Sequence, residues 1–141
     1  MLKEFIDDVC SILGIEPPAL SYDVGHYATD TMLAQCSPDG NTIFIRPYDN
    51  LNPDLFFAAA HELRHVWQIR TDYGRFMAEY RPVSLCSSID EYNLQEAELD
   101  ANAFAGAIMV DFFGVTPLFS NLSDNVRART TRQMKEIMRS T

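Results

Sequence analysis

The spacing of apolar residues predicts four helices, over residues 2–13, 52–70, 90–113 and 122–139. In these stretches apolar side chains recur every three or four residues, which places them on one face of a helix. The first helix should end at Gly14, because the following Pro17-Pro18 pair prevents its continuation. The third should end at Gly114, with Pro117 shortly after it.

The stretch from 52 to 70 has the clearest helix start. Asn52 is a good N-cap, and Pro53 suits the first helical position because proline has no amide hydrogen to leave unpaired. Apolar residues lie nearly all round this helix, including Phe56, Phe57 and Trp67. That pattern predicts a buried helix around which the rest of the chain is organised.

Residues 20–47 predict a small antiparallel sheet. A first strand is expected near Gly25, where Tyr22, Val24 and Tyr27 occur. Residues 31–36 and 41–46 flank the sequence Ser37-Pro38-Asp39-Gly40, which is typical of a tight turn. These two segments should therefore form a hairpin. His26 lies before it and is expected to be a solvated turn residue.

Residues 71–90 show no clear pattern, because Pro82 and two serines interrupt the apolar positions. A connection this long in a compact domain usually carries short elements or a function. It can form one wall of a cleft, with Tyr73, Tyr80 and Tyr92 as candidate hydrogen-bond donors. The elements together predict an α+β fold, with a small antiparallel sheet packed on about four helices.

Composition agrees with one globular domain over residues 1–141, since 47% of the chain is hydrophobic. The net charge of −9 argues against nucleic-acid binding, which normally needs a basic face. No stretch approaches transmembrane length, and the charged N-terminus does not resemble a signal peptide. The three cysteines are odd in number and lack metal-type spacing: Cys10, Cys36 and Cys86. We therefore expect a reducing cytoplasm, with one structural disulfide as the alternative.

The central helix carries the sequence His61-Glu62-Leu63-Arg64-His65. Two histidines four residues apart lie one above the other on a helix, so both imidazoles can reach one metal ion. Glu62 would then be placed to take a proton from a water molecule on that metal. The alternative is a pair of core histidines satisfied by ordinary hydrogen bonds. A metal ion explains the pattern better, because polar groups on a buried helix are costly without a partner.

The helix over 90–113 offers two pairs of residues to complete such a site. Glu96 and Asp100 form one pair, and Glu98 and Asn102 form the other. Only Glu98 and Asn102 share the apolar side of the helix. We therefore expect Glu98 to be the third metal ligand and Glu96 to be solvated. Either Asn102 or Asp100 could orient a ligand histidine through its second ring nitrogen.

His61-Glu62-x-x-His65, followed by Glu98-Leu-Asp-Ala101-Asn102-Ala-Phe104-Ala105, resembles the ImmA/IrrE-type zinc metallopeptidases. These are small gluzincins of bacteria, their phages and mobile elements. The resemblance covers about residues 40 to 110. It implies a minimal zincin-like domain, with His61, His65 and Glu98 as zinc ligands and Glu62 as general base. The chain departs from the family pattern at Arg64, where many relatives have glycine.

The resemblance implies a zinc-dependent peptidase with a protein or peptide substrate, since family members studied as regulators cleave transcriptional repressors. If the strand over 42–46 lies at the sheet edge, it could pair with an extended substrate backbone. No nucleic-acid or membrane partner is expected, and the sequence leaves the oligomeric state open. Two alternatives remain: a zinc-stabilised, catalytically silent interaction domain, and a helical adaptor in which the motif is accidental.

Overall fold

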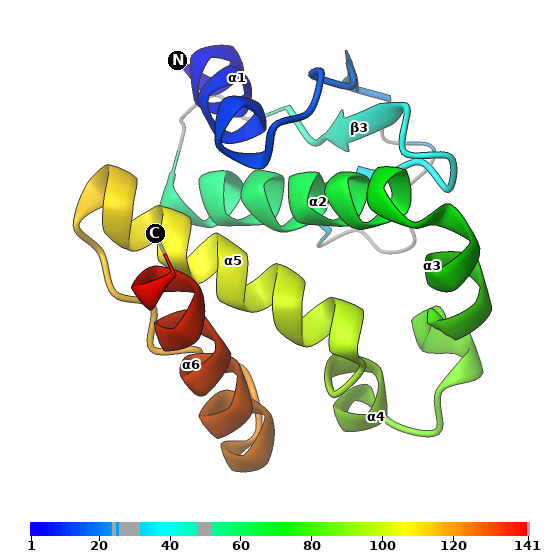
Figure 1. The fold of residues 1–141 in the computed structure, drawn as a ribbon, viewed down its shortest axis with the longest axis vertical. Coiled ribbons are helices and arrows are strands. Elements are labelled where there is room, and N and C mark those ends of the chain that lie inside the picture. Colours follow the sequence, from blue (N-terminus) through cyan, green and yellow to red (C-terminus); the bar gives the residue numbers. More distant parts are fainter. Residues whose placement is uncertain (24, 26–31, 48–51, 141) are drawn as a thin grey trace.

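The computed structural model describes residues 1–23, 25, 32–47 and 52–140. Within this part of the chain the fold is α+β, as predicted, with six α-helices and one three-stranded sheet (Figure 1). The helices are α1 (Leu2–Leu13), α2 (Pro53–Thr71), α3 (Tyr73–Glu79), α4 (Ile89–Asn93), α5 (Glu96–Phe113) and α6 (Asp124–Arg139). The strands are β1 (Ala19–Ser21), β2 (Ala34–Cys36) and β3 (Thr42–Ile45).

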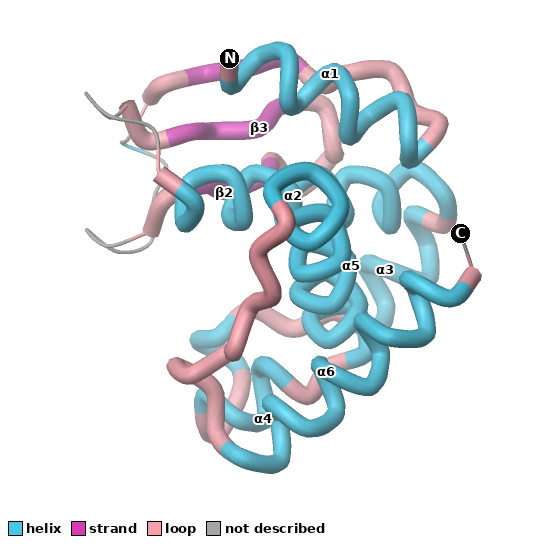
Figure 2. The backbone as a smooth tube through the Cα atoms, turned by 90° about the vertical axis from the view of Figure 1, so that its left-hand side faces the viewer, coloured by secondary structure: helices cyan, strands magenta, loops and turns pink. Residues whose placement is uncertain are grey.

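The long helix α2 lies in the middle of the molecule, between two layers (Figures 1 and 2). On one side it packs against α1 and the sheet, and on the other against α5, which is covered in turn by α6. The Asn52 side chain accepts a hydrogen bond from the Leu55 amide at 3.1 Å, which confirms the predicted N-cap. Burial on both sides explains why α2 is apolar nearly all round.

The predicted hairpin is confirmed, but the sheet is mixed. β2 and β3 pair antiparallel across the turn at residues 37–40, whereas β1 pairs with β3 in parallel. The order β1–β3–β2 makes β3 the central strand, so residues 42–46 do not meet the condition of an edge position under which they could pair with a substrate. Alternating apolar residues could not reveal this, because strand order depends on which segments pair across the fold.

The turn of the hairpin is tied to the C-terminal end of α2. Gly40 has a φ of 72°, a left-handed conformation that suits glycine. Arg70 donates hydrogen bonds to the Gly40 carbonyl from Nε at 3.3 Å and Nη2 at 3.1 Å. These contacts hold the strands beside α2. The first strand of the described chain lies at Ala19–Ser21. The strand expected near Gly25 falls largely outside the described residues, as do Val24, His26 and Tyr27.

The segment after α2 contains short helices that the sequence pattern did not resolve. Asp72 ends α2 and caps α3 by accepting from the Arg75 amide at 3.1 Å. The predicted helix over 90–113 is two helices, α4 and α5, separated at residues 94 and 95. Ser88, and not Asp90, caps α4. Side-chain oxygens of Ser88 and Glu91 accept hydrogen bonds from backbone amides at this point and stabilise a separate helix start. The spacing of apolar residues carries no information about these hydrogen bonds.

Helices α5 and α6 approach closely at Gly106. A Cβ atom at this position would lie 2.7 Å from Met134 Sδ and 3.0 Å from the Phe119 ring, so a larger residue would require these side chains to shift. None of the described helices is both long and apolar enough to cross a bilayer. Cys10, Cys36 and Cys86 are all free thiols, which excludes the alternative of a disulfide among them.

Candidate metal centre

Three side chains bring potential metal-ligand atoms together between α2 and α5. His65 Nε2 lies 2.7 Å from Glu98 Oε2, and His61 Nε2 lies 3.2 Å from Glu98 Oε1. The two imidazole Nε2 atoms are 3.1 Å apart. The histidines lie one turn apart on α2, and Glu98 reaches them from the first turn of α5. Among the described residues, these three form one group able to hold a metal ion.

The helical phase of α5 separates the two candidate carboxylates as the sequence predicted. Glu98 is only 2% exposed and faces α2. The Glu96 side chain is 82% exposed and pairs with Arg75 Nη2 at 3.0 Å, on the outer surface of the helix. Glu96 is therefore too far round the helix to contribute to the buried group.

The charges of the group depend on one another because it is buried. Burial alone would raise the pKa of Glu98, but the adjacent His65 and His61 hold that pKa well below its usual range. Burial disfavours a charged His65, yet the Glu98 carboxylate raises the pKa of His65 to about 9. The site therefore requires positive charge beside Glu98, which either protons or a metal cation can supply.

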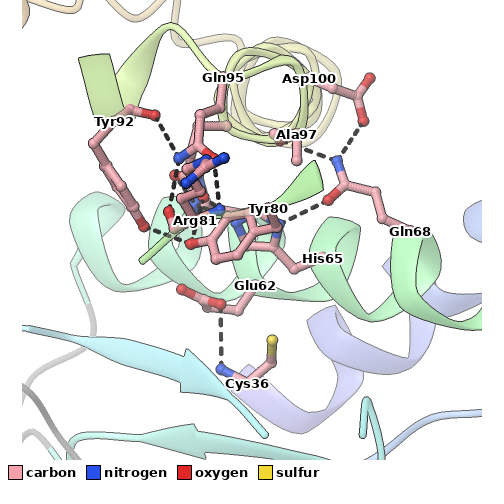
Figure 3. Close-up of polar contacts among 12 residues, drawn as sticks. Cys36, Glu62, His65, Gln68, Tyr80, Arg81, Tyr92, Gln95, Ala97 and Asp100 are labelled. Carbon is pink, nitrogen blue, oxygen red and sulfur yellow. Dashed lines mark hydrogen bonds and ion pairs between the residues drawn. The ribbon is translucent and has the colours of Figure 1, made fainter. Parts of the chain in front are cut away.

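Glu62 lies beside this group, on the side of the sheet. Its Oε2 accepts a hydrogen bond from the Cys36 amide of β2 at 3.2 Å (Figure 3). Burial raises the pKa of the Glu62 carboxyl, while the nearby His65 and His61 partly oppose that rise. A carboxylate with a raised pKa binds a proton more readily at neutral pH, which suits a general base.

The sequence prediction missed Gln68, which contacts His65 directly. Gln68 Oε1 lies 2.8 Å from His65 Nδ1, the ring nitrogen that faces away from Glu98. The amide nitrogen of Gln68 donates to Asp100 Oδ2 at 2.9 Å and to the Ala97 carbonyl at 3.0 Å. Figure 3 shows Gln68 between His65 and Asp100. A position three residues after a helical histidine is a neighbour on the same face, so the spacing could have indicated it.

Asp100 also accepts two hydrogen bonds from Arg64, at 2.7 Å from Nε and 3.0 Å from Nη2. Of the two residues proposed to support a histidine, Asp100 therefore acts through Gln68. Asn102 is half-buried, and it is not a hydrogen-bond partner of either histidine. Arg64, the departure from the family pattern, thus joins α2 to α5 beside the candidate metal centre.

Two of the three candidate tyrosines reach the site. Tyr80 donates to Glu98 Oε2 at 3.1 Å, and Tyr92 lies 2.8 Å from the Tyr80 hydroxyl. Because Tyr80 uses its hydrogen on Glu98, Tyr92 must donate to Tyr80. Burial and the Glu98 carboxylate raise the pKa of both tyrosines, so their hydroxyls keep their protons. Tyr73 is exposed and takes no part.

A cavity of about 720 Å³ lies between α2, α3, α5 and α6. Its lining includes Arg64, Gln68 and Asp100, but neither His61, His65, Glu98 nor Glu62. The cavity therefore borders the residues that support His65 and not the potential ligand atoms themselves.

The donor set fits a zinc ion. Zinc commonly takes imidazole nitrogen and carboxylate oxygen in tetrahedral sites, where neighbouring ligand atoms are about 3.3 Å apart. The two imidazole Nε2 atoms are 3.1 Å apart, and each has one Glu98 oxygen close to it, Oε2 at 2.7 Å from His65 and Oε1 at 3.2 Å from His61. If these three residues held a tetrahedral ion, one coordination position would remain open.

Comparison with known proteins finds no match: no family model, no curated protein and no solved structure is similar to this chain.

Proposed function

We propose that this protein is a zinc-dependent metallopeptidase that hydrolyses a peptide bond in a protein substrate. The observation that carries the proposal is the convergence of His61, His65 and Glu98 in a buried site, with Glu62 beside them. The spacing of the motif and the burial of the group agree with this function. An ordinary pair of core histidines would not need a buried carboxylate between them.

In this proposal His61, His65 and Glu98 hold the ion, and Glu62 is the general base. A bound zinc ion would supply Lewis acidity, polarising the scissile carbonyl and making a water molecule more acidic. Glu62 accepts the proton of that attacking water and later delivers it to the leaving amine. The Cys36 amide holds Glu62 Oε2, which leaves Oε1 for the proton.

The substrate would approach along β2. Among the described strands, β2 lies at one edge of the sheet, and its Cys36 amide points away from β3, toward Glu62. An extended peptide can add to such an edge through backbone hydrogen bonds. In this proposal the peptide path runs next to Glu62. It takes the place of a path along residues 42–46, which would have required that strand to lie at the sheet edge.

The finer parts of the proposal rest on the resemblance of the two motifs. They are a zincin-like arrangement of the fold, kinship with the ImmA/IrrE-type peptidases, a regulatory protein as substrate, and a cytoplasmic setting. The α+β architecture and the placement of HExxH on the central helix are compatible with them. No nucleic-acid or membrane partner is part of the proposal.

The first prediction tests this function by comparing wild type with Glu62→Gln. Both proteins should bind one zinc ion per chain, because Glu62 is not among the three ligands. Only wild type should cleave protein substrates, and the loss in the variant should be about 100-fold or more, since general-base catalysis typically contributes that much. The measurements are elemental analysis and cleavage of proteins from the native host, read by mass spectrometry.

Equal cleavage by Glu62→Gln would contradict the mechanism. Zinc binding by wild type without any hydrolysis would instead favour the zinc-stabilised interaction domain. No uptake of a transition metal by either protein would exclude both readings and leave the helical adaptor.

A further inference from the structure

We propose that Gln68, Asp100 and Arg64 form a relay that fixes which nitrogen of His65 faces the metal. The relay rests on the proposed function, because it assumes that His65 is a ligand. Gln68 and Arg64, both on α2, contact Asp100 on α5. Gln68 lies between His65 and Asp100 (Figure 3). They act by positioning His65, and none of them touches the potential ligand atoms of the group.

The orientation of the Gln68 amide is determined by its partners. Its nitrogen lies within 3.0 Å of two groups that can only accept hydrogen bonds, the Ala97 carbonyl and the Asp100 carboxylate. Turning the amide over would put its oxygen against both of these acceptors. The Gln68 oxygen must therefore face His65.

This orientation determines the proton position on His65. An amide oxygen can only accept, so the hydrogen of the 2.8 Å contact belongs to His65 Nδ1. With the proton on Nδ1, the lone pair of a neutral imidazole is on Nε2, which faces Glu98 and His61. The opposite tautomer would present an N–H to the metal and could not bind it.

Asp100 is itself held from the other side. Arg64 makes a two-point contact with its carboxylate, and the guanidinium carbon lies 4.0 Å from the Trp67 ring centre and 4.8 Å from that of Phe104. Two hydrogen bonds in a planar fork fix the carboxylate more firmly than one contact would. The Asp100 oxygen that receives the Gln68 amide is thereby kept in place.

His61 has no comparable support among the described residues, because its recorded polar contacts are through Nε2 to His65 and Glu98. The two histidines are therefore unequal. His65 should be the ligand held in advance, and His61 the ligand that adjusts as the ion binds.

The second prediction tests the relay with Gln68→Met, which keeps the length of the side chain but removes its amide. Gln95→Met is the matched control, because the Gln95 amide is also bonded at both ends but contacts Arg81 and Tyr92 instead of a histidine. Zinc affinity, measured by competition with a chelator, should fall about 10- to 100-fold in Gln68→Met, the usual effect of losing such a support. In Gln95→Met it should stay close to the wild-type value.

A second measurement detects the hydrogen bond between His65 and Gln68 directly, and it needs no zinc. In wild type, NMR of labelled protein should detect the His65 Nδ1 hydrogen and a coupling across the hydrogen bond to the side-chain carbonyl carbon of Gln68. The Nδ1 hydrogen should exchange much faster in Gln68→Met, and its exchange should be unchanged in Gln95→Met. Equal zinc affinity in Gln68→Met and wild type, or the absence of this coupling in wild type, would overturn the relay.

The outcomes also separate the relay from the proposed function. If zinc binds and the relay is observed but no peptide is cleaved, only the peptidase proposal fails. If zinc binds equally well to Gln68→Met and wild type, only the relay fails. If wild type takes up no zinc, both fail.

Discussion

Glu96 and Glu98 differ by two positions on α5, and that difference puts one carboxylate on the surface and the other in the core. A step of two residues turns a helix by about 200°, so the two side chains point in nearly opposite directions. The buried Glu98 is stabilised by two imidazoles and the Tyr80 hydroxyl. Such a group is destabilised when one member is lost, because the others remain buried without their partner.

The third prediction follows from this contrast. Glu98→Ala should weaken zinc binding by at least about 100-fold, because it removes a ligand and the negative charge that attracts the cation. Glu96→Ala should change zinc affinity by less than about two-fold, since an exposed ion pair contributes little. Competition with a chelator measures both. A larger loss in Glu96→Ala than in Glu98→Ala would show that the assignment of the two carboxylates is reversed.

The first turn and the middle of helix α5 make different contacts. Its first turn carries Glu98 to α2, and its middle packs against α6 through Gly106. Because α6 covers the outer face of α5, the contact at Gly106 holds the helix that carries Glu98. Small residues along α5 allow both close approaches, to α2 on one side and to α6 on the other.

The fourth prediction concerns this packing. Gly106→Ala should lower the free energy of unfolding by about 1 kcal/mol, because crowding of the added methyl group against Met134 and Phe119, which typically costs about 1 to 3 kcal/mol, outweighs a helix-propensity gain of up to about 1 kcal/mol. Gly74→Ala in α3 is the control, since a Cβ there meets nothing within 4 Å. It should be neutral or slightly stabilising, because alanine is the better helix former. Chemical denaturation measures both, and equal stability of Gly106→Ala and wild type would show that α6 can shift away.

Of the three polar residues that are buried in the described chain, two lie together between α2 and α5, and the third, Thr130, lies on α6. His65 and Glu98 are buried at 4% and 2% exposure, and they belong to the same group. A ligand that binds only the folded state stabilises it by mass action. Metal binding should therefore be visible in the stability of the complete chain, independently of any activity.

The fifth prediction is a shift in the melting temperature with zinc. At free zinc 100 times above the dissociation constant, the folded state should gain about 2.7 kcal/mol. That corresponds to a rise of roughly 8 °C, at about 3 °C per kcal/mol for a chain of this size. A chelator should reverse the rise. Magnesium should not replace zinc, because it prefers oxygen ligands, and His61→Ala should show no shift; a full shift in that variant would count against the site.

Much of the fold could be predicted from local pattern. The helices α1, α2 and α6, the Asn52 cap and the hairpin follow from apolar spacing, capping residues and the turn at 37–40, all of which act between residues close in sequence. The grouping of His61, His65 and Glu98 was also predictable, because helical phase places each on the buried side of its own helix.

Only the tertiary structure decided how these elements meet. The parallel pairing of β1 with β3, the edge position of β2 beside Glu62, and the break between α4 and α5 depend on contacts between distant segments. The same holds for the orientation of the Gln68 side chain. Its spacing from His65 indicates a contact, but Asp100 and Ala97 on another helix determine which amide atom faces His65. Periodicity records which face of an element is buried, but it does not record which neighbour covers that face.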